Sequence, residues 1–145
     1  MKRLLIYIIG FVLTTAVASA QDYETDYRAL QQQFEERSAT TPALIKTYLN
    51  QYPYTPYSDE IHLMEGVLHA EKEKYKPAIK AFSKINAKNL SRETQPMLHF
   101  YWGYALLKQE NYKKALSYLL RLKQRESLYT PHARYYAGYC YYCTK

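Results

Sequence analysis

The chain has 145 residues, of which 48% are hydrophobic and 23% are charged, and its formal net charge is +7. This length and balance are typical of one globular domain. Basic residues are spread among acidic ones without a run of five or six, so the charge gives little support to nucleic-acid binding, and no nucleic-acid partner is predicted. Only four glycines accompany 18 tyrosines, which argues against a fold built on turns.

The first 20 residues have the composition of a secretory signal peptide. Residues 1–3 are positively charged, residues 4–17 are mainly apolar, and residues 18–20 form the small-residue sequence Ala-Ser-Ala before Gln21. A transmembrane anchor is the less favoured alternative, because the apolar run is shorter than the roughly 20 residues that span a bilayer. No cysteine for a lipid anchor lies near the cleavage point. We therefore expect an exported protein that is periplasmic or associated with the outer membrane.

A helical hairpin is predicted over residues 21–54. Its first helix is indicated by aromatic and apolar residues at intervals of four, three and four: Tyr23, Tyr27, Leu30 and Phe34. Its second helix is expected to begin with Thr41 as N-cap and Pro42 at the first helical position, and to end at Pro53. The turn after Pro53 leads to Ser58, the N-cap expected for the following helix.

Two later segments share one spacing pattern, and a third begins like them. The residues of the first segment are Gly66, Tyr75, Ala78, Phe82 and Ile85. The same residue types recur 37 positions later as Gly103, Tyr112, Ala115, Leu119 and Leu122. A further glycine, Gly138, follows 35 positions after Gly103 in a similar aromatic context. This pattern resembles the tetratricopeptide repeat family, whose unit is a pair of antiparallel helices.

The resemblance implies an all-α, right-handed solenoid. The expected organisation is a signal peptide, a degenerate first repeat, two repeats and the first helix of an incomplete repeat, over residues 1–20, 21–54, 55–90, 91–128 and 129–145. The glycines would let the two helices of a pair approach closely. His62, Glu65 and His69 fall where the family packs apolar groups, so we expect looser packing in that repeat.

The aromatic helix predicted after Pro131 ends near Lys145, before the tyrosine and alanine that would begin its partner helix. A terminal helix of a solenoid normally has a polar outer face. We therefore expect an N-terminal fragment of a longer array. The alternative is self-association, in which the aromatic helix pairs with another chain.

No catalytic or metal-binding arrangement is predicted. Cys140 and Cys143 form a C-x-x-C pair, but they lie in the C-terminal half of a predicted helix, where the helix dipole does not favour a thiolate. We therefore interpret them as small core residues or as an incidental disulfide. His62 and His69 are two turns apart on one helix without a carboxylate set. We expect no enzymatic activity and no cofactor.

The resemblance also implies a binding groove, because the family's first helices line the concave side of the array. The corresponding residues are Leu63, Val67, Phe100, Tyr104, Leu107, Lys108, Tyr135, Tyr139 and Tyr142. Such a surface suits a peptide or an amphipathic helix; alternatively, the last tyrosines pack against a further helix or against each other. The expected function is a scaffold of the cell envelope that binds a protein partner, with peripheral association to the envelope. Alternatives are the docking arm of a longer enzyme or sensor, and a glycan-binding protein.

Overall fold

The computed structural model describes residues 22–145, so the predicted signal peptide lies outside the described residues. Within this range the regular elements are helices and no strand is present, as expected for an all-α protein. The chain divides into two compact units between Thr55 and Pro56. No helix between residues 22 and 145 is long and apolar enough to cross a membrane.

The first unit is a helical hairpin formed by residues 22–35 and α2 (Thr41–Gln51). Apolar side chains from both helices are buried between them, including Leu30, Phe34 and Ile45. Tyr48 is 4% exposed and donates its hydroxyl hydrogen bond to the Tyr23 carbonyl over 2.8 Å. The ring of Tyr48 is thus buried while its hydroxyl keeps a hydrogen-bond partner, as is usual for a tyrosine in a protein core.

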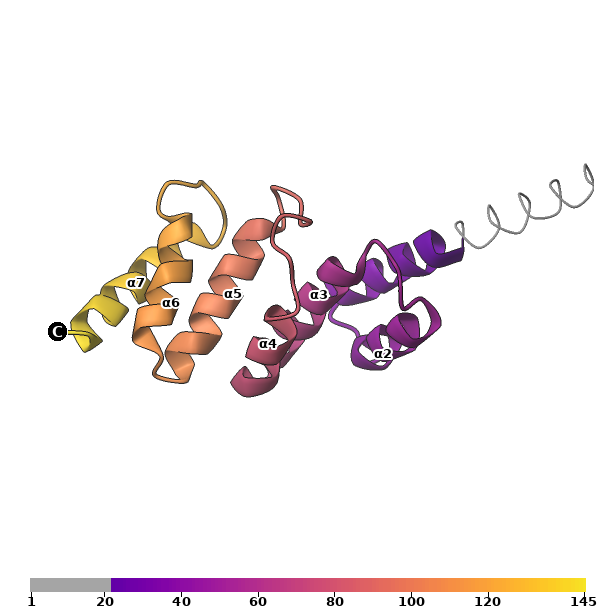
Figure 1. The fold of residues 1–145 in the computed structure, drawn as a ribbon, viewed down its shortest axis with the longest axis horizontal. Coiled ribbons are helices and arrows are strands. Elements are labelled where there is room, and N and C mark those ends of the chain that lie inside the picture. The colour runs from indigo at the N-terminus through magenta and orange to yellow at the C-terminus, as the bar shows by residue number, and fades with distance from the viewer. Residues whose placement is uncertain (1–21) are drawn as a thin grey trace, which may run out of the picture. The chain divides into compact units, whose positions relative to one another are not determined.

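The second unit contains five α-helices, and helices that follow one another in the chain pack together (Figure 1). They are α3 (Ser58–Glu71), α4 (Tyr75–Phe82), α5 (Gln95–Lys108), α6 (Tyr112–Leu119), which continues into a 3-10 turn (Leu120–Leu122), and α7 (Thr130–Cys143). The helices α3 and α4 form one pair, α5 and α6 form the next, and α7 packs on α6. The paired arrangement agrees with a helical repeat.

The glycines of the spacing pattern lie at the closest approach of each helix pair. A Cβ atom added to Gly66 would lie 2.2 Å from Cε1 of Phe82, and one added to Gly103 would lie 2.8 Å from Cγ of Leu119. Both distances are shorter than real carbon contacts, so a side chain at either position would require the neighbouring atoms to move. The predicted role of these two glycines is therefore confirmed.

Three helices end in the same way, at Arg37, Glu73 and Glu110. Each of these residues has a positive φ, of 54°, 58° and 59°, and they are spaced by 36 and 37 residues. After each one, a backbone N–H bonds a carbonyl five residues earlier: Ser38 to Gln33, Lys74 to His69 and Asn111 to Leu106. This is the Schellman type of helix ending. The hairpin of the first unit thus shares its turn geometry with the later pairs, although it lacks their glycine.

The long connection between α4 and α5 is held to α3 by Asp59. This residue is 7% exposed and accepts hydrogen bonds from the Asn86 backbone N–H at 2.8 Å and from Nδ2 of Asn89 at 2.7 Å. Leu90, which is 4% exposed, adds an apolar anchor to the same connection. From the sequence, Asp59 lies at the positive end of the α3 dipole. In the structure, its buried carboxylate instead makes its main contacts with hydrogen-bond donors from a loop.

Two predicted N-caps are wrong. Thr41 and Ser58 are the first residues of α2 and α3, whose N-caps are Thr40 and Tyr57. The Thr41 hydroxyl instead donates to the carbonyl of Gln33 in the preceding helix, over 2.9 Å. Thr130, also followed by proline, turns its hydroxyl back to the Arg125 carbonyl. In both cases the threonine hydroxyl satisfies a carbonyl earlier in the chain and does not cap the helix that follows.

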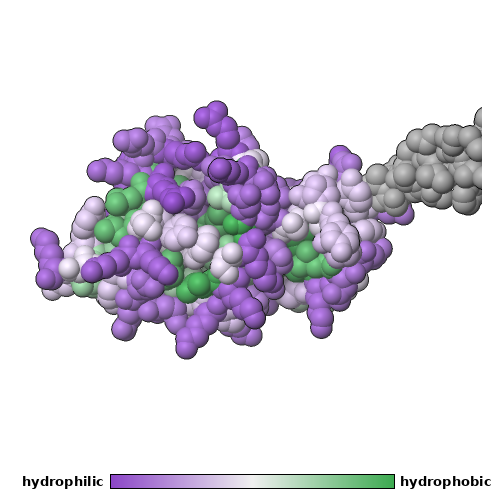
Figure 2. All heavy atoms as spheres, viewed as in Figure 1, coloured by the Kyte–Doolittle hydropathy of each residue, from purple (hydrophilic) through white to green (hydrophobic). Residues whose placement is uncertain are grey.

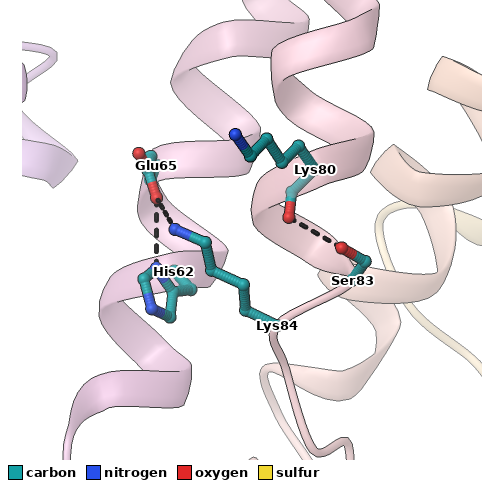
Figure 3. A network of polar contacts seen from close by, with 5 residues as sticks. All are labelled: His62, Glu65, Lys80, Ser83 and Lys84. Carbon is teal, nitrogen blue, oxygen red and sulfur yellow. Dashed lines mark hydrogen bonds and ion pairs between the residues drawn. The ribbon is translucent and has the colours of Figure 1, made fainter.

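The expected loosening of the α3–α4 pair is also wrong. Ile61 and Val67 are fully buried, and the polar residues lie half-buried at the flank of α3. There, Nδ1 of His62 lies 3.1 Å from a carboxylate oxygen of Glu65, and Nζ of Lys84 lies 3.8 Å from the same oxygen (Figure 3). The polar side chains therefore pair with each other beside the core and do not interrupt it.

Candidate functional site

Half-buried aromatic rings from three helices meet around Phe100. Its ring stacks on Tyr104 at 6.0 Å between centroids and on Tyr129 at 5.2 Å, and it lies 6.3 Å from Tyr136. Two further rings extend the cluster, because Tyr75 lies 6.0 Å from Tyr104 and Tyr101 lies 5.9 Å from Tyr129. We call this surface the aromatic face, and define it by six residues that are all partly exposed: Tyr75, Phe100, Tyr101, Tyr104, Tyr129 and Tyr136.

Helix periodicity explains how these residues come together. Phe100 and Tyr104 are four residues apart on α5, so they occupy neighbouring positions on one side of that helix. Tyr129 precedes α7 and Tyr136 follows two turns later, which directs both rings toward α5. Tyr75 is the first residue of α4 and completes the cluster from the other side.

The aromatic face has polar tips and a cation at its edge. Desolvation, followed by the neighbouring Tyr104 hydroxyl, raises the pKa of Tyr75 to about 12. Burial also raises the pKa of Tyr136, so both hydroxyls stay protonated near neutral pH. Nζ of Lys108 lies 5.5 Å from the centre of the Tyr104 ring, within the range of a cation–π contact. The arrangement can offer apolar contact area, hydroxyl donors and one positive charge.

Six residues of the predicted groove lie on two helices: Leu63 and Val67 on α3, and the other four on α5. Phe100 and Tyr104 are part of the aromatic face, and Lys108 lies at its edge. The other three are only 3%, 0% and 7% exposed and form part of the core in this structure: Leu63, Val67 and Leu107. Burial leaves these three little contact area for a partner in this structure, and their part in a groove stays a prediction.

The three groove residues predicted on α7 are exposed, but they lie apart from the centre of the aromatic face. Tyr135 is 71% exposed and contacts the ring of Tyr136, whereas Tyr139 is 46% exposed and lies 6.2 Å from Tyr112 at the start of α6. Tyr142 is 80% exposed. Whether these residues bind a partner stays a prediction.

Sequence reasoning missed four members of the aromatic face: Tyr75, Tyr101, Tyr129 and Tyr136. A usable signal was present, because Tyr136 lies seven residues after Tyr129, which corresponds to two helical turns. That spacing predicts a shared surface with Phe100 only if the N-terminal end of α7 lies beside Phe100, and this is a tertiary contact. The groove predicted from the family resemblance instead included Tyr135 and Tyr139, which lie 35 residues after Phe100 and Tyr104.

The residues considered for metal or redox chemistry are not gathered into a site. Between residues 22 and 145, no group of three or more His, Cys, Asp or Glu side chains could hold a metal ion. Cys140 has no exposed surface, and its burial raises the pKa of the thiol, which opposes thiolate formation. His99 is buried, and its Nδ1 atom has no hydrogen-bond partner among the described residues.

The visible surface contains separate apolar areas. Figure 2 shows hydrophilic side chains over most of this side of the second unit, with small areas of apolar atoms between them over α5 and α6.

Comparisons with known protein families, with curated proteins and with solved structures find no match to this chain. The function must therefore be argued from the chain's own surfaces.

Proposed function

We propose that the chain is a non-enzymatic scaffold that binds a segment of a protein partner on the aromatic face. The observation that carries this proposal is the contact of six partly exposed aromatic rings across α4, α5 and α7. Isolated exposed aromatic residues need no explanation, but a contiguous group places several large contact surfaces side by side. Tyrosine is among the residues that contribute most to binding energy at protein interfaces.

The ring geometry favours a peptide ligand over a sugar. A sugar binds an aromatic residue by stacking on an open ring face, but the faces of Phe100 are occupied by Tyr104 and Tyr129, which stack at interplanar angles of 11° and 24°. Such a surface suits apolar side chains, with backbone carbonyls accepting the tyrosine O–H groups.

A tetratricopeptide type of repeat is the proposed architecture. It is supported by the recurring glycine contacts at Gly66 and Gly103 and by the helix endings spaced by 36 and 37 residues. The proposed location is the periplasm or the surface of the outer membrane. This part rests on the composition of residues 1–20, which precede the described residues.

Selection of peptides from a displayed random library on the immobilised chain would test the aromatic face. A peptide selected on the wild-type chain should bind the Tyr104→Ala and Tyr136→Ala variants at least tenfold more weakly, because an interface aromatic contributes about 2 kcal/mol. Binding would be measured by fluorescence anisotropy, with thermal melting to show that each variant is folded.

Tyr54→Ala is the matched control, because Tyr54 is 98% exposed and lies in the first unit. It should leave peptide affinity unchanged. Selection of no peptide, or equal loss of affinity in all three variants, would contradict a specific role for the aromatic face. An oligosaccharide array probed with the same chain would reveal a sugar ligand, and a hit that depends on Tyr104 would replace the peptide proposal.

A further inference from the structure

A second surface lies between α6 and α7, on the side of α7 that carries Gly138. It is a hollow of about 240 Å³, and its lining includes Leu119, Lys123, Arg134, Ala137, Gly138 and Tyr141. None of these residues belongs to the aromatic face. A Cβ atom added to Gly138 would meet nothing within 4 Å, in contrast to Gly66 and Gly103.

The preceding repeat contains the same surface in a covered form. Counting back 35 residues, Gly138 corresponds to Gly103 and Ala137 to Trp102. There, α6 covers both positions: Leu119 packs on Gly103, and the ring of Tyr118 stacks on Trp102 at 4.4 Å. The molecule itself therefore shows which kind of element fits this surface, namely a helix that presents bulky apolar side chains.

Charge specifies the occupant further. Arg134 stands where the preceding repeat has the buried His99, and Arg134 is exposed and donates to the Lys123 carbonyl at 3.2 Å. The hollow therefore has apolar walls and two cationic residues, Lys123 and Arg134, in its lining. A helix that carries acidic side chains beside its apolar ones would complement this edge.

A second copy of the chain fits these requirements poorly. On the described α-helices, only α2 and α7 carry large apolar residues with an exposed fraction of 40% or more. These are Leu44 on α2 and tyrosines such as Tyr141 on α7. Neither α2 nor α7 contains an acidic residue. Two copies of α7 would also bring Arg134 near its own counterpart. The described helices of a second copy are therefore poor occupants of the hollow, and a helix with acidic side chains from a different protein complements it better.

We infer that the hollow between α6 and α7 receives an amphipathic helix of a partner protein, which packs a leucine or phenylalanine over Gly138 and places acidic side chains beside Lys123 and Arg134. The bound helix would pack on α7 in the way that α6 packs on α5. This surface goes beyond the aromatic face and shares no residue with it, so variants can test the two surfaces separately.

Two synthetic peptides that span residues 111–126, the segment that contains α6, provide the probes. The acidic peptide carries glutamate in place of every lysine and arginine of this segment, and the basic peptide keeps the natural sequence. Fluorescence anisotropy with the full chain should give at least tenfold tighter binding of the acidic peptide. An acidic peptide with alanine at the position of Leu119 should lose at least tenfold, because it cannot fill the space over Gly138.

Two variants of the chain test the location. Gly138→Leu places a side chain in the hollow at a position where an added Cβ atom meets nothing within 4 Å, so the fold should be retained while binding of the acidic peptide falls at least tenfold. Arg134→Glu should remove most of the preference for the acidic peptide, because the lining then carries one positive and one negative charge. The control is Lys76→Glu, an equivalent charge change at an exposed position of α4, and it should change neither affinity by more than twofold.

Equal binding of the two peptides, or unchanged binding to both Gly138→Leu and Arg134→Glu, would overturn the inference. Light scattering on the wild-type chain provides a further test. A dimer that Gly138→Leu converts to a monomer would show that a second copy occupies the hollow, which also overturns it. Tyr104→Ala should leave binding of the acidic peptide unchanged, so failure here is distinguishable from failure of the aromatic face.

Discussion

The α3–α4 and α5–α6 pairs place the same residue types at equivalent positions and use them differently. Gly66 and Gly103 both lie at a helix contact, but the first faces an aromatic ring and the second faces an aliphatic side chain. His62 and His99 are also 37 residues apart. His62 contacts the Glu65 carboxylate at the flank of α3, whereas His99 is buried without a partner for Nδ1.

The difference teaches that a repeat position specifies where a side chain lies but not what surrounds it. The Glu65 partner of His62 is replaced by Trp102 in the second pair, so the second histidine has no neighbouring carboxylate at that position. Arg121 and Arg125 approach His99 instead, and they oppose its protonation. Each pair therefore responds differently to substitution and to pH.

The largest effect is expected from a methyl group at Gly66. Gly66→Ala brings Cβ to 2.2 Å from the Phe82 ring, which is buried and rigid, so the helices must separate. We expect a loss of about 3 kcal/mol in the free energy of unfolding, at the upper end for overpacking. At Gly103 the nearest atoms belong to the Leu119 side chain, which can adjust, and Gly103→Ala should cost about 1 kcal/mol.

Urea unfolding of both variants would measure the difference. Gly138→Ala is the control, because its Cβ meets nothing and alanine favours a helix by about 1 kcal/mol over glycine. It should stabilise the chain. Equal costs at Gly66 and Gly103, or a loss at Gly138, would contradict the assigned packing.

Acid should destabilise the α5–α6 pair through His99. Burial, followed by Arg121 and Arg125, lowers the pKa of His99 from 6.5 to about 4. The unfolded chain therefore binds a proton between these pH values while the folded chain does not, so stability is lost as pH falls through this window. Between pH 7.5 and pH 5 the loss should be about 2 kcal/mol, at about 1.4 kcal/mol per pKa unit.

His99→Leu should remove most of this pH dependence, because leucine occupies a similar volume and does not titrate. Urea unfolding at the two pH values would compare the variant with the wild-type chain. His62→Leu is the matched control at the equivalent repeat position. If His62→Leu removed the pH dependence and His99→Leu left it, the assignment to the buried histidine would be wrong.

A smaller effect is expected from the polar contacts at the flank of α3. The hydrogen bond with His62, followed by Lys84, lowers the pKa of Glu65 against the opposing effect of burial. Its stabilisation is present above the unfolded pKa of 4.5 and is lost as pH falls through the lower folded value. Glu65→Gln should cost about 1 kcal/mol or less at pH 7, because the side chain is 30% exposed.

Thermal melting in low and high salt would measure this contribution. Lys84→Met removes only the longer contact of 3.8 Å and should cost a few tenths of a kcal/mol at most. A larger cost for Lys84→Met than for Glu65→Gln would show that the lysine, and not the histidine, is the important partner.

A small gain in stability is expected at the helix endings. Glu73 and Glu110 adopt left-handed backbone conformations, with φ of 58° and 59°, which glycine adopts without the crowding of Cβ. Glu110→Gly should raise the free energy of unfolding by about 0.5 kcal/mol, and Glu73→Gly should match it if the two endings are equivalent. Lys114→Gly within α6 should instead lose about 1 kcal/mol.

The helix pairs could be predicted from the sequence, and the contacts between pairs could not. Glycine and alanine spacing located the close approach of α3 to α4 and of α5 to α6, because small residues that recur at one position of a helix pair indicate a close helix contact. Only Phe100 and Tyr104 of the aromatic face were predicted. The other members depend on how the start of α7 lies against α5, which no periodicity within a single helix specifies.

The sequence by itself determined the helical class, the period and the glycine positions at which helices meet, because each depends on local spacing and side-chain size. Tertiary structure alone decided the environment of each repeated residue. It covers Gly103 with Leu119 and leaves Gly138 open, and it buries His99 while His62 contacts a carboxylate. The physical reason is that burial and pKa depend on atoms from the neighbouring helices, and these differ from one repeat to the next.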